Sequence, residues 1–172
     1  MAFEREAFTK LLEDSYSAYY NIITEENAPN LPMVFRADYF QRNEAYWLSK
    51  KIVMYGNETN EYAYVFSADS MDELKVKECI QFALDDGLPR VNPGKEHQYT
   101  NIKTIFIANE FTPDAVKAIE KTDFQKSYHH SLWGYSNLLN SAVDVDNEKA
   151  YANRAGHEMK KYFKKLFAAQ KK

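Results

Sequence analysis

Two stretches of the chain, 95–100 and 126–135, combine polar and aromatic side chains in a way that suits ligand binding. The residues we single out are His97, Thr100, Lys126, Ser127 and Trp133, with Glu61 as a further member from another strand. Small-molecule sites are typically aromatic-walled pockets with a few polar groups. If the strands carrying the two stretches are neighbours, these side chains line one pocket. The alternative is an edge strand whose polar residues face water.

The four histidines do not form a metal-binding motif. They are His97, His129, His130 and His157. If 124–133 is a strand, His129 and His130 point to opposite faces, so only one of them can join a given site. No HExxH or similar spacing is present. We therefore expect structural or surface roles for the histidines, no metal site and no cofactor.

Covalent catalysis and phosphate binding also lack support in the sequence. No serine stands in a Gly-x-Ser-x-Gly elbow, and none of the five glycines clusters into a phosphate-cradling loop. Cys79 lies in an apolar helical run, and no nearby residue would lower its pKa. We interpret it as a small buried hydrophobic residue. No catalytic residue is expected.

The C-terminal segment is strongly basic although the net charge of the chain is −3. Residues 149–172 hold eight Lys or Arg against one acid, Glu158. Such a helix would suit nucleic acid or an anionic membrane. However, Lys160, Lys161, Lys164 and Lys165 fall between apolar positions, as expected for a solvated outer face, and near a helix end where the dipole favours cations. Nucleic acid is therefore not the favoured partner.

Composition indicates one globular domain over 1–172, with 45% hydrophobic and 27% charged residues. Aromatic residues are frequent, at 15%, so the core or a binding surface is rich in rings. The acidic N-terminus does not resemble a signal peptide, and no run approaches the roughly 18 apolar residues that span a bilayer. A single cysteine excludes an internal disulfide. We expect a soluble, cytoplasmic protein without membrane contact.

The first half of the sequence predicts a helix and three strands. Apolar residues, including Tyr19, recur at helical spacing over 3–20. The expected strands are 33–42, 45–55 and 61–66, joined by turns at 42–44 and 56–60. Because these connections are short, the strands should form an antiparallel meander.

The second half predicts helices alternating with strands. Ser70 and Glu73 form a capping box for a helix that ends near Asp86. The most apolar strand, 102–108, belongs at the centre of the sheet. The remaining expected elements are a short helix with Thr112 as cap and Pro113 in its first turn, a strand over 124–133, and a long helix from Asp146 onward.

These elements give an α+β fold: a mixed sheet containing a three-strand antiparallel meander, with helices packed on it, in the order α-β-β-β-α-β-α-β-α. This order resembles the restriction-endonuclease-like fold. That resemblance implies a metal-dependent nuclease site, with an acid followed two residues later by Lys. Glu61 opens the third strand, but position 63 is Ala. A protein of this type would therefore have a degenerate site.

Three short motifs also resemble a group of uncharacterised bacterial proteins. They are 60–66 (NEYAYVF), 96–100 (EHQYT) and 131–135 (SLWGY). The resemblance covers most of the chain. It implies a bacterial cytoplasmic protein and brings no activity, cofactor or ligand with it.

The leading hypothesis is a non-enzymatic binding or interaction domain with an aromatic, partly polar pocket, whose partner is a small molecule or another protein. The second is an enzyme or degenerate nuclease-like protein with a metal at Glu61. The third is nucleic-acid binding through the C-terminal helix. Oligomeric state stays open at this point.

Overall fold

A seven-stranded mixed sheet with four α-helices packed on it forms the part of the chain that the computed structural model describes, residues 4–24, 28–46 and 53–172. The α+β class is confirmed. In chain order the elements are α1 (Arg5–Ser17), β1 (Asn21–Ile23), β2 (Met33–Tyr46), β3 (Val53–Met71), α2 (Glu73–Gly87), the 3-10 helix η1 (Leu88–Arg90), β4 (His97–Phe111), α3 (Pro113–Lys121), β5 (Gln125–Ser127), β6 (Tyr135–Asp144), β7 (Lys149–Ala152) and α4 (Met159–Gln170).

The strands lie in the order β1-β2-β3-β4-β6-β5, and β7 also pairs with β6. β1, β2 and β3 are successive antiparallel neighbours, so the sheet contains a three-strand meander. Its strands differ from those expected, because β1 belongs to it and 61–66 pairs directly with β2. β3, β4 and β6 are parallel to one another. The apolar strand β4 is central, as its sequence predicted.

The turns expected at 42–44 and 56–60 are wrong, because both segments lie inside long paired strands. Arg42 is opposite Glu58, and Glu44 is opposite Gly56. The Arg42 guanidinium also donates to the Glu58 carboxylate at 2.7 Å, which ties the strands together where turn residues suggested a break. Of the expected middle strand 45–55, residues 47–52 lie outside the described residues.

The first three helices are confirmed with adjusted ends. Asp72, rather than Ser70, caps α2 by accepting from the backbone N–H of Lys75 at 2.8 Å. Thr112 caps α3 by accepting from Ala115, and Pro113 occupies its first turn. On α1 the buried stripe ends at Tyr16 instead of Tyr19, which is 81% exposed.

The expectations for the end of the chain need correction. Only 125–127 of the expected strand 124–133 is extended, and β6 follows where no element was expected. The last helix begins at Met159 instead of Asp146. The physical reason is a local hydrogen bond between a side chain and the backbone. The Asp144 carboxylate accepts a hydrogen bond from the Asn147 N–H at 2.9 Å, and this bond forms a turn.

The basic residues of α4 lie in its first turns, so they do not compensate a C-terminal helix dipole as expected. Lys161, Lys164 and Lys165 are exposed, while Phe163 and Leu166 are buried against the sheet. Three of the four lysines thus lie on the solvent side of α4, and the expectation that nucleic acid does not bind there stays a prediction. No helix in the described residues is long and apolar enough to cross a membrane.

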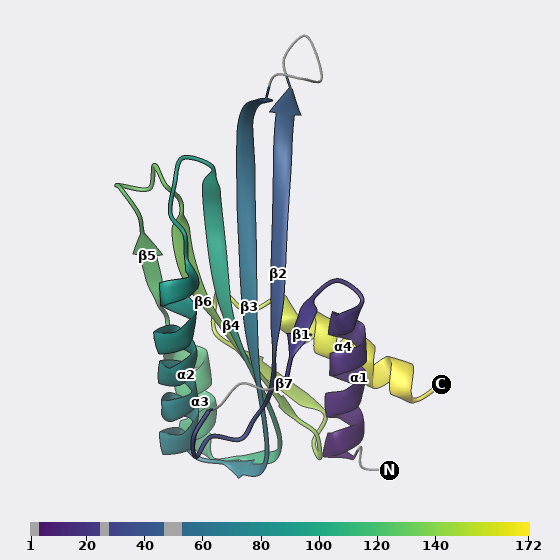
Figure 1. Ribbon diagram of the computed structural model, residues 1–172. Helices are drawn as coiled ribbons and strands as arrows, with labels where there is room; N and C mark the ends of the chain where they lie inside the picture. Colours follow the sequence, from purple (N-terminus) through teal and green to yellow (C-terminus); the bar gives the residue numbers. More distant parts are fainter. Residues whose placement is uncertain (1–3, 25–27, 47–52) are drawn as a thin grey trace.

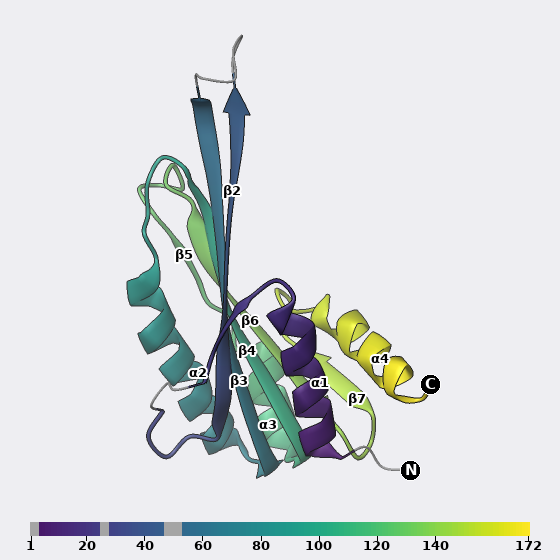
Figure 2. The ribbon, with the colours of Figure 1, turned by 45° about the vertical axis from the view of Figure 1, so that its right-hand side comes forward.

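The helices divide between the two faces of the sheet. Figures 1 and 2 show α2 and α3 on one face and α1 and α4 on the other, with the upper parts of β2 and β3 extending past them. Because side chains alternate along a strand, Tyr64 and Phe66 pack in the α2 core while Val65 faces the α1 core. Cys79 is buried in the α2 core, where burial raises the pKa of its thiol to about 12, as its apolar neighbours predicted.

Candidate functional site

The structure brings together three of the expected site residues. His97 is 4% exposed and its Nδ1 lies 2.7 Å from the Trp133 carbonyl oxygen, while its Nε2 lies 2.8 Å from the Thr100 hydroxyl. Since a carbonyl only accepts, the proton is on Nδ1, and the Thr100 hydroxyl donates to Nε2. Both ring nitrogens are thus engaged within the chain, which is a structural arrangement.

The segment that carries Trp133 is a strained turn instead of a strand. His129, His130 and Ser131 have φ of 47°, 52° and 69°, a left-handed conformation that costs about 1–2 kcal/mol per residue. Gly134 also has a positive φ, and a Cβ there would lie 2.4 Å from the carbonyl oxygen of Gln98. The hydrogen bond from His97 holds this turn against β4.

The other expected residues lie apart. Lys126 and Ser127 are exposed on β5, which neighbours β6 and not β4, so these two side chains do not join His97. The two stretches meet further along, where Tyr99 pairs with Tyr135. Lys126 Nζ lies 5.4 Å from the centre of the Tyr128 ring. Glu61 lies on the face of the sheet that α1 and α4 cover. Ligand binding by any of the six stays a prediction.

Glu61 forms a buried ion pair with Lys103, a residue for which the sequence gave no role. Lys103 Nζ lies 2.7 Å from Glu61 Oε2, and the two side chains are 11% and 16% exposed. The Tyr20 hydroxyl also donates to Glu61 Oε2, and Asn101 Nδ2 donates to Oε1 at 3.2 Å. Each carboxylate oxygen therefore has at least one donor.

These contacts keep Glu61 ionised. Burial by itself would raise the pKa of Glu61, but the Lys103 ammonium and the hydrogen bonds from Lys103, Tyr20 and Asn101 outweigh it, so the net pKa is lowered. Burial raises the pKa of the Tyr16 and Tyr20 hydroxyls well above the usual range, so both stay protonated.

A cavity of about 390 Å³ opens beside this ion pair, between the end of α1, the start of α4 and β4. Four tyrosines and four other side chains line it: Ser15, Tyr16, Tyr19, Tyr20, Lys103, Glu158, Met159 and Tyr162. Its size falls within the range of small-molecule sites, roughly 300–1,000 Å³.

The tyrosine rings form walls that are tilted against one another. The Tyr16 ring centre lies 4.6 Å from that of Tyr20 at 53°, and 6.2 Å from that of Tyr162 at 78°. The Tyr162 hydroxyl donates to Ser15 Oγ at 2.5 Å, which joins α4 to α1. Tilted rings leave both faces and edges available to a planar ligand.

The Tyr16 hydroxyl is the unusual group of this cavity. Tyr16 is 6% exposed, yet its hydroxyl has no hydrogen-bond partner in the described part of the chain, whereas buried tyrosine hydroxyls usually have one. Among the described side chains, Gln170 Oε1 is the polar atom that is fully enclosed and has no partner. The Tyr16 hydroxyl is therefore not fully enclosed, and it opens into the cavity that Tyr16 lines.

Sequence reasoning missed Lys103, Tyr16 and Tyr162 as site residues, although two signals were present. Lys103 interrupts the most apolar strand of the chain, and a lysine inside such a strand needs a partner acid. A weaker signal marks Tyr16, because Phe8, Leu12 and Tyr16 recur every four residues and therefore share the buried side of α1.

A larger cavity, of about 540 Å³, lies at the opposite end of the sheet where α2 and α3 begin. Two of its polar side chains, Asp72 and Thr112, are already engaged as the caps of their own helices. It offers no unpartnered buried group, and we favour the tyrosine-lined cavity for that reason. Within the described ranges, no three His, Cys, Asp or Glu residues lie close enough to share a metal ion.

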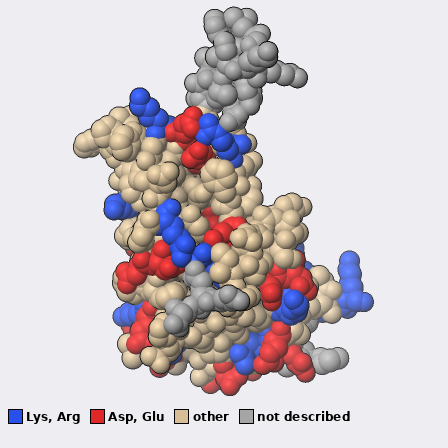
Figure 3. Space-filling view, viewed as in Figure 1, with Lys and Arg blue, Asp and Glu red and all other residues tan. Residues whose placement is uncertain are grey.

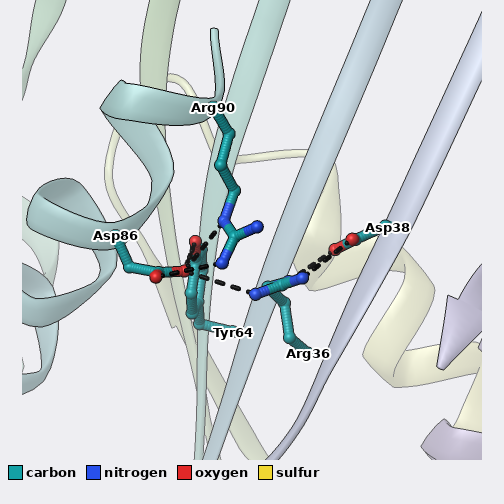
Figure 4. A network of polar contacts seen from close by, with 5 residues as sticks. All are labelled: Arg36, Asp38, Tyr64, Asp86 and Arg90. Carbon is teal, nitrogen blue, oxygen red and sulfur yellow. Dashed lines mark hydrogen bonds and ion pairs between the residues drawn. The ribbon is translucent and has the colours of Figure 1, made fainter. Parts of the chain in front are cut away.

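A second polar cluster, on the α2 face, is fully engaged and serves as a reference (Figure 4). Arg36 is 3% exposed and forms two hydrogen bonds with Asp38, at 2.7 and 3.0 Å. Asp86 accepts from Tyr64 at 2.6 Å, from Arg90 at 3.1 Å and from Arg36 at 3.4 Å. Burial would raise the pKa of Asp86, but these donors lower it overall.

The chain is thus an α+β protein with a mixed sheet, an engaged ion network on one face and an open tyrosine-lined cavity on the other. Residues 4–165 match the model of the family described as "Domain of unknown function (DUF8052)", and the chain belongs to that family. This agrees with the resemblance to uncharacterised proteins in three motifs. No curated protein and no solved structure matches the chain.

Proposed function

We propose that this protein is a binding domain that takes a small molecule into the cavity between α1, α4 and β4. The observation that carries the proposal is the Tyr16 hydroxyl, which belongs to a mostly buried side chain, opens into the cavity and has no partner in the described residues. A ligand that accepts a hydrogen bond from this hydroxyl would gain about 0.5–1.5 kcal/mol.

Charge states in the cavity support binding more than acid–base catalysis. A general acid or base works best when its pKa lies near the operating pH. The pKa of Glu61 is lowered and those of Tyr16 and Tyr20 are raised, so all three pKa values move further from neutral pH. The alternative of a metal at Glu61 gains no support, since its partners are Lys103, Tyr20 and Asn101.

Nucleic-acid binding through α4 is also not favoured. Two basic residues of α4 and its C-cap already have acidic partners, since Lys161 lies 3.4 Å from Glu158 and Lys171 lies 2.8 Å from Glu148. On the face seen in Figure 3, where α4 lies behind α1, basic and acidic side chains are intermingled. The resemblance of the three motifs to bacterial proteins and the single cysteine support a bacterial, cytoplasmic setting for the domain.

A thermal-shift screen of small ring compounds tests the proposal, with a variant that fills the cavity. A compound at about a hundred times its Kd stabilises the protein by about 2.7 kcal/mol. Met159→Trp places a large side chain in the cavity wall, and Lys165→Trp, exposed on the same helix, is the matched control. We expect compounds that stabilise the wild type and Lys165→Trp but not Met159→Trp. Equal stabilisation of Met159→Trp, or no stabilising compound, would contradict the proposal.

A further inference from the structure

The Tyr16 hydroxyl and the Lys103 ammonium with its partner Glu61, which we call the cavity base, narrow the class of ligand. This inference rests on the proposed function. Two kinds of donor are available there. The Tyr16 hydroxyl has no partner in the described residues, and the Lys103 ammonium has three N–H groups, of which one hydrogen bond, to Glu61, is formed within the described ranges. The cavity base therefore presents donors to a ligand that accepts.

The acceptors around Lys103 are occupied. Glu61 already receives hydrogen bonds from Lys103, Tyr20 and Asn101. A ligand group that only donates would find few acceptor positions left, since three of the roughly four on Glu61 are taken. Glu158, the other carboxylate that lines the cavity, is exposed to solvent. Consequently an oxygen that accepts, such as a carbonyl, suits the site better than an amine.

The charge of the cavity base is balanced, which argues against a charged ligand. The Lys103 ammonium and the Glu61 carboxylate neutralise each other at 2.7 Å and are both mostly buried. A ligand carboxylate would add a second, uncompensated negative charge beside Glu61, and a ligand cation would face the ammonium of Lys103. Burial of an unpaired charge is costly, so a neutral group is favoured.

The side chains that form the cavity walls determine which ring system of the ligand fits. Tyr16, Tyr20 and Tyr162 surround the space with rings tilted by 53° and 78°, and the Met159 thioether adds a polarisable surface. Glu158, at the cavity rim, is exposed and lies 3.4 Å from Lys161, so solvent and Lys161 weaken its effect on a ligand.

We infer that the cavity binds an uncharged planar ring compound with a carbonyl oxygen, which accepts hydrogen bonds from the Tyr16 hydroxyl and the Lys103 ammonium while the ring packs against the tyrosines. Aryl amides and heteroaromatic carbonyl compounds belong to this class. The orientation follows from the geometry: the carbonyl points toward β4, and the ring lies between α1 and α4.

Isothermal titration with three probes of one ring and different charge tests this inference: benzamide, benzoate and benzylamine at neutral pH. We expect benzamide to bind at least tenfold more tightly than the two charged probes. Tyr16→Phe should weaken benzamide binding about tenfold, the equivalent of one hydrogen bond of about 1.4 kcal/mol. The control Tyr128→Phe removes a hydroxyl that bonds Ser136 outside the cavity, and should leave benzamide binding unchanged.

The outcomes separate this inference from the proposed function. If benzoate or benzylamine binds as tightly as benzamide, and Met159→Trp abolishes that binding, the ligand class is wrong but the cavity is a binding site. If benzamide binds equally well to Tyr16→Phe, the donor assignment is wrong. If no probe binds and the ring-compound screen is also silent, both proposals are overturned.

Discussion

Tyr64 and Tyr16 are both buried tyrosines, one on each face of the sheet, and they differ in what their hydroxyls contact. Tyr64 is fully buried and donates to Asp86 at 2.6 Å, inside a network with Arg36 and Arg90. Tyr16 is nearly as buried, yet its hydroxyl has no partner in the described part of the chain. One face of the sheet is therefore closed by its own side chains, and the other keeps an open donor.

This difference means that the polar groups on one face contribute to the stability of the fold, and those on the other face are available for ligand binding. A satisfied polar network holds α2 and η1 against the sheet, and it gains nothing from a ligand. An unsatisfied group in a cavity lowers stability slightly and is available to a ligand. Substitutions on the two faces should therefore affect different measurements, from large losses of stability on the α2 face to losses of affinity at the cavity.

The largest expected loss of stability comes from Arg36→Ala. Removing this buried guanidinium leaves Asp38 and Asp86 with fewer donors, and breaking a buried ion pair costs about 3 kcal/mol. The variant should show this decrease in unfolding free energy in urea titration. As a control, Lys77→Ala breaks an exposed pair with Glu73 and should cost less than about 1 kcal/mol. Similar losses in both variants would show that the network is not stabilising.

Glu61→Gln should destabilise the protein by about 2 kcal/mol at neutral pH, since it leaves the Lys103 ammonium without a counter-ion. The loss should depend on pH. Because the folded-state pKa of Glu61 is lowered from its ordinary value of 4.5, its carboxylate stabilises the fold above that pH, and this contribution disappears as pH falls through the folded pKa.

Urea titrations of wild type and Glu61→Gln from neutral pH downward measure this dependence. The difference in unfolding free energy between the two proteins should shrink below about pH 4.5. Glu110→Gln, at an exposed position near the end of β4, should change the unfolding free energy by less than about 0.5 kcal/mol. A constant difference between wild type and Glu61→Gln over the whole pH range would show that the ion pair does not carry the effect.

Local signals in the sequence predicted the fold class, the first three helices and the central strand, because caps and apolar periodicity act within a few residues. Thr112 with Pro113 marked the start of α3 correctly. In contrast, the turn predicted around Gly56 is wrong, because long-range pairing with β2 keeps this segment extended within β3. The helical spacing near the C-terminus extended too far, because the Asp144 side chain forms a turn that periodicity does not reveal.

The candidate site was only partly predictable. Glu61 was selected from the sequence, but its partner Lys103 became evident only when parallel pairing placed β4 beside β3. His97, Thr100 and Trp133 do meet, in an arrangement that engages both ring nitrogens of His97. The tyrosine walls depend on how α1 and α4 cross, which no local pattern specifies.

Unfolding free energies of Tyr16→Phe and Tyr64→Phe, with and without benzamide, test the central claim most directly. Without the probe, Tyr64→Phe should lose about 1–2 kcal/mol for its missing hydrogen bond, and Tyr16→Phe should stay within about 0.5 kcal/mol of the wild type. With saturating benzamide, wild type and Tyr64→Phe should gain equal stability, and Tyr16→Phe should gain about 1.4 kcal/mol less. If Tyr16→Phe loses as much stability as Tyr64→Phe without the probe, or gains as much as the wild type with it, the Tyr16 hydroxyl is not the open donor of a binding site.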